Sequence, residues 1–207
     1  METSPAPLKD RVHRSPAGIA GGVVLLALGA WLGVDAVVQG EGRTPWLALA
    51  GLLCVVPIVV AFTLRPAVFD NEDRLRVRNP FRMITLPWAA VASFRSGYSN
   101  EVVDQEGVKY QLWAVPVSLR ARKKAQRNLA RAAAMGEPGR GPLSGGPTRE
   151  RPTRAAADQV IDDLRERQEA RAGEPGAQGP ATVRWAWEVL APAAVGALLL
   201  IVLAATG

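Results

Sequence analysis

The sequence has almost none of the residues that cross-link small proteins or bind transition metals. Its 207 residues include one cysteine, Cys54, and one histidine, His13. A single cysteine excludes an internal disulfide framework, and one cysteine with one histidine excludes an ordinary Cys/His metal site. Cys54 lies within an apolar run, where it is typical of a small packing residue, with palmitoylation as the alternative interpretation.

Catalytic signatures are missing as well. The chain contains no glycine-rich phosphate loop, no nucleophile elbow and no acid–base pair built on histidine. The carboxylates of Asp162, Asp163 and Glu166 stand among arginines at helical spacing, which is typical of surface ion pairs. We therefore expect a protein that is not an enzyme and that uses no cofactor or metal.

Charge is absent from three long apolar runs, residues 15–34, 44–64 and 189–207. About 20 such residues form a helix that crosses a hydrocarbon core of roughly 30 Å. Tryptophan and arginine flank these runs, as they do at membrane interfaces. A cleaved signal peptide is disfavoured, because apolar sequence resumes soon after the first run ends. We predict transmembrane helices over residues 15–38, 44–64 and 185–207.

The distribution of lysine and arginine predicts the orientation of these helices. Residues 1–14 contain Lys9, Arg11 and Arg14, and the link between the first two runs contains only Arg43. The long segment between the second and third runs is rich in both residue types. We therefore expect an inner-membrane protein with a cytoplasmic N-terminal tail (residues 1–14), a cytoplasmic middle segment and an external C-terminus. The abundance of Ala, Arg, Gly and Pro is typical of a bacterial sequence.

Residues 65–117 have the alternation and turns of a small β-domain. Arg74–Arg78 alternates strictly, so Leu75 and Val77 should face a core while the arginines face outward. The expected strands are 66–69, 74–78, 81–86, 93–96, 101–104 and 108–114, with a bend or helical turn over 87–91. We expect four aromatic residues to belong to the core rather than to a ligand site: Trp88, Tyr98, Tyr110 and Trp113.

A series of short motifs follows this pattern: NPFR, PW-x-x-V, GYS-x-EV, a glycine turn and Y-x-x-WAVP. Their order resembles the bacterial pleckstrin-homology-like (PH-like) domain of the low-molecular-weight protein antigen 6 type, found in small actinobacterial membrane proteins. The resemblance implies a small, strongly bent antiparallel β-sheet closed by one C-terminal helix. The matching residues are Asn79, Pro80, Phe81, Arg82, Pro87, Trp88, Val91, Gly97, Tyr98, Glu101, Gly107, Tyr110, Trp113 and Pro116.

Two segments compete for the role of that closing helix. Residues 118–135 have helix-forming composition but are strongly basic, whereas residues 153–171 carry an apolar stripe through Val160, Ile161 and Leu164. We favour residues 153–172, which makes 118–152 a basic flexible insertion and 173–183 a linker. The chain is thus predicted to be an α+β membrane protein, with three transmembrane helices and a cytoplasmic PH-like antiparallel β-domain closed by one C-terminal helix.

Basic residues are the candidate contacts for an anionic ligand or lipid. Guanidinium groups suit phosphate geometrically, although exposed arginines are also ordinary solvated side chains. The candidates on the strands and in the basic segment are Arg74, Arg76, Arg78, Arg82, Arg120, Arg122, Lys123 and Lys124.

The pattern favours a binding or scaffolding domain that contacts a protein partner or a second copy at the membrane. The alternative is a module that reads anionic lipid headgroups with the arginine-rich strand face and the basic segment. Nucleic acid is disfavoured because no base-reading or stacking module is present. Transport has little support, because the spans contain no charge pair.

Overall fold

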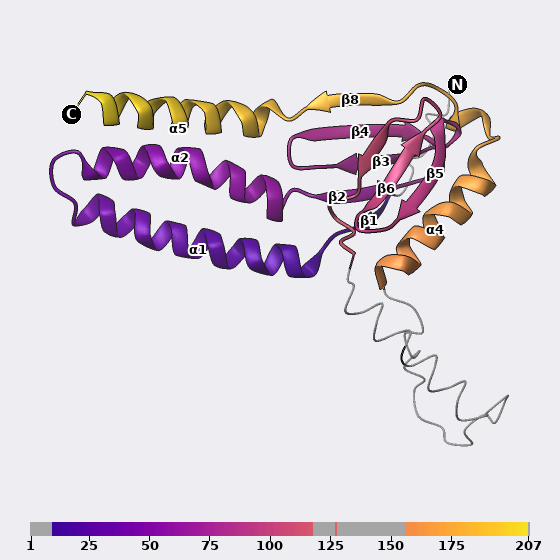
Figure 1. Ribbon diagram of the computed structural model, residues 1–207, viewed down its shortest axis with the longest axis horizontal. Coiled ribbons are helices and arrows are strands. Elements are labelled where there is room, and N and C mark those ends of the chain that lie inside the picture. Colours follow the sequence, from indigo (N-terminus) through magenta and orange to yellow (C-terminus); the bar gives the residue numbers. More distant parts are fainter. Residues whose placement is uncertain (1–9, 118–126, 128–155, 207) are drawn as a thin grey trace, which may run out of the picture.

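The computed structural model describes residues 10–117, 127 and 156–206. Figure 1 shows an elongated molecule in which apolar helices occupy one end and a β-rich domain the other. The helices are α1 (Pro16–Val38), α2 (Thr44–Thr63) and α5 (Trp187–Ala205), and each is long and apolar enough to cross a membrane. The prediction of three such helices is confirmed, with α5 beginning slightly later than expected.

Small residues allow α2 to pack closely against both neighbouring helices. A Cβ atom added to Gly196 of α5 would lie 2.3 Å from the backbone nitrogen of Cys54 in α2. On α1, a Cβ atom at Gly33 would lie 2.4 Å from the side chain of Leu52. Such close approach at glycine is a common way for membrane helices to pack.

Five antiparallel strands form the first sheet, in the order β1-β2-β3-β4-β8. Its central strands, β2 (Ala67–Asp70), β3 (Arg74–Arg78) and β4 (Arg82–Pro87), follow the prediction closely. The edges do not, because β1 (Arg11–His13) lies in the predicted tail 1–14 and β8 (Thr182–Trp185) in the predicted linker and third helix. Both edge strands lead directly into apolar helices, so the sheet is continuous with α1 and α5.

A second, three-stranded sheet has the order β5-β6-β7. It consists of β5 (Val91–Ser96), β6 (Asn100–Asp104) and β7 (Lys109–Gln111). The short helix η1 (Trp88–Ala90) connects the two sheets where the sequence predicted a bend or helical turn, and Trp88 is completely buried there. Its indole Nε1 donates a hydrogen bond of 2.9 Å to the carbonyl of Asn71, which satisfies its only polar group.

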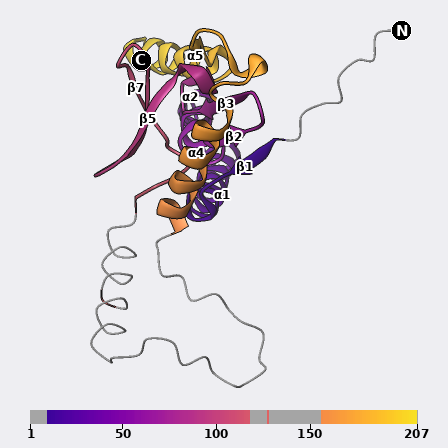
Figure 2. The ribbon, with the colours of Figure 1, turned by 90° about the vertical axis from the view of Figure 1, so that its right-hand side faces the viewer.

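Helix α4 (Ala156–Arg171) closes the core between the sheets. Its Ile161 and Leu164 are buried with Leu75 and Val77 of the first sheet and Val102 of the second. Seen from the domain end, α4 lies in front of the strands and the apolar helices lie behind them (Figure 2). After α4, the short helix η2 (Pro175–Ala177) buries Ala177 in the same core and leads to β8. The competing segment 118–135 lies outside the described residues apart from Arg127.

Two of the four aromatic residues assigned to the core lie elsewhere. Tyr98 is 98% exposed, because it belongs to the turn between β5 and β6 and has no neighbour across a sheet. Trp113 is 41% exposed and lies edge-on to Phe62 of α2, with ring centroids 5.4 Å apart. Trp113 therefore connects the domain to a helix, while Trp88 and Tyr110 pack in or against the core as predicted.

Candidate functional site

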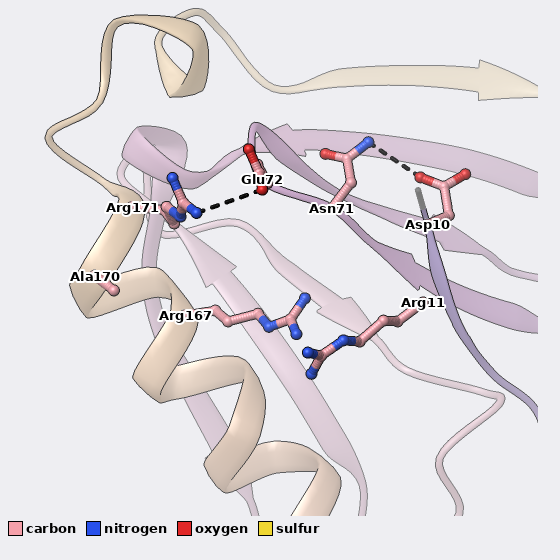
Figure 3. Close-up of a pocket in the computed structure, with 7 residues that line it drawn as sticks. All are labelled: Asp10, Arg11, Asn71, Glu72, Arg167, Ala170 and Arg171. Atoms are coloured by element: carbon pink, nitrogen blue, oxygen red, sulfur yellow. Dashed lines mark hydrogen bonds and ion pairs between the residues drawn. The ribbon is translucent and has the colours of Figure 1, made fainter. Parts of the chain in front are cut away.

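A polar pocket of about 640 Å³ lies at the end of the domain away from the apolar helices. We call it the distal pocket. Strand β2 runs away from α2 and β1 runs toward α1, so the β2–β3 turn and the start of β1 meet at this far end. The last turns of α4 complete the wall. The residues that line the pocket are Asp10, Arg11, Asn71, Glu72, Arg167, Ala170 and Arg171 (Figure 3).

A buried carboxylate holds the base of this region together. Asp70 is only 1% exposed, and its Oδ1 lies 2.9 Å from Nε2 of His13 on β1. Its other carboxylate oxygen accepts a hydrogen bond from Arg167 of α4. A buried carboxylate needs such partners, because burial without them is costly. Asp70 thus connects two strands and a helix and fixes Arg167 at the pocket.

The remaining pocket side chains present charges of both signs. Figure 3 shows the guanidinium groups of Arg11 and Arg167 pointing toward each other. Arg171 lies 3.6 Å from Glu72, and the amide of Asn71 donates a 3.0 Å hydrogen bond to Asp10. A neighbouring cavity of about 390 Å³ shares both Arg11 and Arg167 and is also lined by carboxylates of α4, those of Asp163 and Glu166. The whole surface therefore alternates in sign, which suits a partner that also carries both charges.

The predicted strand-face arginines are spread along the sheet rather than gathered in one cluster. Arg76 pairs with Asp10, and its guanidinium carbon also lies 5.4 Å from the centre of the Phe69 ring. Arg78 lies over the same ring at 5.1 Å. These cation–π contacts use part of the binding capacity of both guanidinium groups.

The other two strand-face arginines occupy opposite ends of the sheet. Arg82 covers the ring of Trp185 on β8 at 4.4 Å, near the apolar helices. Arg74 lies near the distal end with its side chain 48% exposed, 4.0 Å from Asp73. Their role in anion binding stays a prediction. The predicted contacts in the basic segment lie outside the described residues: Arg120, Arg122, Lys123 and Lys124.

A second cavity, of about 650 Å³, lies where the domain joins the apolar helices; we call it the junction cavity. Its charged residues are Arg14 before α1, Arg65 after α2, Arg78 at the end of β3, and Glu188 in the first turn of α5. Arg65 donates hydrogen bonds of 2.7 Å to the carbonyl of Asn79 and 2.6 Å to Glu188. Glu188 is therefore already paired within the cavity.

Electrostatics at the junction cavity leave positive charge in excess. Burial lowers the pKa of Arg78, and the nearby positive charges of Arg65 and Arg14 lower it further. An arginine stays protonated at neutral pH despite such a shift. Of the three arginines, only Arg65 forms an ion pair in the part of the chain that the structure describes. Sequence reasoning treated Arg14 and Arg65 only as charges flanking the helices, and their meeting with Arg78 depends on the fold.

Among the described residues, no group of three or more His, Cys, Asp or Glu side chains could hold a metal ion. The polar clusters are instead built from arginines and isolated carboxylates. Such groups are able to form hydrogen bonds and ion pairs.

Comparison with known proteins gives one match. Residues 65–141 match the family model described as the bacterial PH domain. The matched stretch covers β2 to β7 and ends before α4 begins at Ala156. No curated protein and no solved structure matches the chain. Motif order, two antiparallel sheets and the family match agree that residues 65–141 are similar to a bacterial PH domain, and the chain joins them to three helices that are long and apolar enough to cross a membrane.

Proposed function

We propose that the protein is a membrane-anchored, non-catalytic binding module that engages a protein partner or a second copy of itself through the distal pocket. PH domains are generally binding modules without catalytic activity. The excess of lysine and arginine around the domain, relative to the α1–α2 link, supports a cytoplasmic domain on the inner membrane and an external C-terminus.

The observation that carries this proposal is the mixed charge of the distal pocket. The side chain of Arg11 makes no ion pair or hydrogen bond with the rest of the chain that the structure describes, and it faces Arg167 across the pocket. Carboxylates of the β2–β3 turn and of α4 surround these cations. A uniformly anionic membrane surface would be repelled by those carboxylates, whereas a protein segment can match both signs.

The location of the pocket supports the same proposal. It lies at the end of the domain away from the apolar helices, where a soluble or membrane-anchored partner can reach it. A lipid-reading role for the strand face has less support, because Arg76 is already paired with Asp10 and Arg82 is stacked on Trp185.

Site-specific photocrosslinking in native membranes tests the proposal. A photoreactive residue at Ala170, which is exposed in the pocket wall, should give a discrete conjugate. The same residue at exposed Ser93 on β5 should not. Conjugate mass distinguishes a second copy from another protein. Arg11→Glu should abolish the conjugate, because it reverses the charge at the pocket without removing a side-chain hydrogen bond or ion pair of the described chain. Monomer alone at Ala170, or a conjugate that survives Arg11→Glu, would contradict the proposal.

A further inference from the structure

The junction cavity combines cationic and apolar walls in an order that matches a lipid. Its charged residues cluster where the three apolar helices begin or end next to the domain. Its apolar residues continue along one face of α2, at Val56, Pro57 and Val60, and along the start of α5 at Val189 and Pro192. Polar groups thus lie at the headgroup level of a bilayer, and apolar groups lie toward the hydrocarbon.

The depth of the cavity fits an acyl chain as well as a headgroup. Val56 precedes the end of α2 at Thr63 by seven residues, and at 1.5 Å per residue the cavity extends roughly 10 Å along the helix. Pro192 is in the second turn of α5, which gives that wall a similar reach. A free phosphate or another small anion would leave this apolar part uncovered.

The charges of the cavity select a negative ligand. Glu188 forms its ion pair with Arg65 and only attracts Arg78 from a distance, so Arg14 and Arg78 make no ion pair among the described residues. Arg14 is exposed, and Arg78 is partly buried over Phe69. A phosphate placed between the two would offset the mutual repulsion of the arginines and accept charge-assisted hydrogen bonds. Basic pockets between membrane helices bind anionic headgroups by the same physical chemistry.

We propose that the junction cavity binds one anionic phospholipid, with its phosphate between Arg14 and Arg78 and an acyl chain along α2 and α5. This site is separate from the distal pocket and does not depend on the proposed protein partner. The bound lipid would join the domain to the helices, because Arg14 precedes α1 whereas Arg78 belongs to the sheet.

Lipid retention by the full chain tests the proposal. The chain is reconstituted in vesicles of phosphatidylcholine mixed equally with phosphatidylglycerol, extracted gently, and examined by native mass spectrometry. The unaltered chain should retain phosphatidylglycerol preferentially. The double variant Arg14→Gln/Arg78→Gln should lose at least about tenfold of that preference, since each arginine near an anionic surface contributes on the order of 1 kcal/mol. Equal preference in the variant would overturn the proposal.

A matched control removes the same amount of charge elsewhere on the domain. Arg74 and Arg95 are both exposed, on β3 and β5, and neither lines the junction cavity. The Arg74→Gln/Arg95→Gln variant should keep the preference of the unaltered chain. If it loses as much as the cavity variant, general electrostatic attraction explains the retention and the site is refuted.

A measurement on the unaltered chain avoids any folding defect in the variants. Phosphatidylglycerol with a photoreactive acyl chain should label α2 around Val56 to Val60 and α5 around Val189 to Pro192. Labelling spread evenly around the three helices would overturn the proposal. Glycerol phosphate, a soluble form of the headgroup, should not displace the lipid, because it lacks the acyl chain. Displacement would show a site for a soluble anion instead and would equally refute a lipid site.

Discussion

Replacing Arg167 with glutamine tests whether buried Asp70 holds α4 against the sheet. Asp70 is 1% exposed, and Arg167 is its cationic partner from α4. Removing one member of a buried ion pair costs about 3–5 kcal/mol, because a charge is left buried without compensation. The Arg167 side chain is 23% exposed and His13 remains 2.9 Å from Asp70, so water and His13 offset part of this loss and we expect about 2–3 kcal/mol.

Hydrogen exchange of the full chain in nanodiscs measures this loss locally. A cost of about 2–3 kcal/mol corresponds to exchange about 30- to 150-fold faster in amides protected by the docking of α4. Arg171→Gln is the control, because Arg171 lies one turn later and its side chain forms an ion pair with Glu72 at 3.6 Å, on the surface. Such pairs contribute about 0–1 kcal/mol. Equal acceleration in both variants would refute the assignment of Asp70 as the anchor of α4.

The double variant Asp70→Asn/Arg167→Gln separates charge from packing. The two amides leave no carboxylate or guanidinium group buried, so exchange should be slower than in Arg167→Gln alone. If the double variant exchanges faster than both single variants, the loss comes from packing rather than from an unpaired charge.

Three further predictions concern other parts of the fold. Gly196→Ala should lower the thermal unfolding midpoint in detergent, because its Cβ would lie 2.3 Å from the α2 backbone, whereas Gly51→Ala has open space and should be neutral or stabilising. Burial and a hydrogen bond to a carboxylate raise the pKa of Tyr110. In a Tyr98→Phe chain, phenolate absorbance should therefore develop at higher pH when folded than in denaturant. The stability from neutral Tyr110 is complete below the unfolded pKa of about 10 and is lost as pH rises toward the folded value; equal titration in both states would contradict this. Trp88→Ala should cost about 3–5 kcal/mol in denaturant unfolding, because a completely buried ring is removed, and a cost below about 1 kcal/mol would show that Trp88 is not a core residue.

The central strands could be predicted because one of their faces is buried, which makes apolar and polar residues alternate along the sequence. In β3, Leu75 and Val77 are buried while the three arginines that alternate with them are not, so the alternation is visible. The edge strands carry no such signal. All four side chains of β8 are exposed, and β1 buries none of its three completely. Backbone pairing holds these strands, together with a few polar or ring contacts such as His13 with Asp70 and Trp185 with Arg82.

The candidate sites were harder to predict, because their members meet only in three dimensions. Arg167 was assigned to surface pairing on its helix, yet its partner Asp70 lies 97 residues earlier in the chain. Arg14 and Arg65 can be recognised in the sequence as positive charges that flank apolar helices. Nothing in the pattern around them indicates that they share a cavity with Arg78. Tyr98 was predicted to be a core residue because it is aromatic, but it lies in a turn and has no neighbours to bury it.

The placement of β8 has a consequence for how the protein is made. Its partner β4 ends at Pro87, and β8 itself begins at Thr182, just before α5. During synthesis the five-stranded sheet therefore stays open at one edge until residues 182–185 have left the ribosome. Pairing β8 with β4 closes the long loop of chain between Pro87 and Thr182, and closing so long a loop is slow. The domain completes its sheet only as α5 emerges, so folding of the domain and delivery of that helix to the bilayer coincide in time.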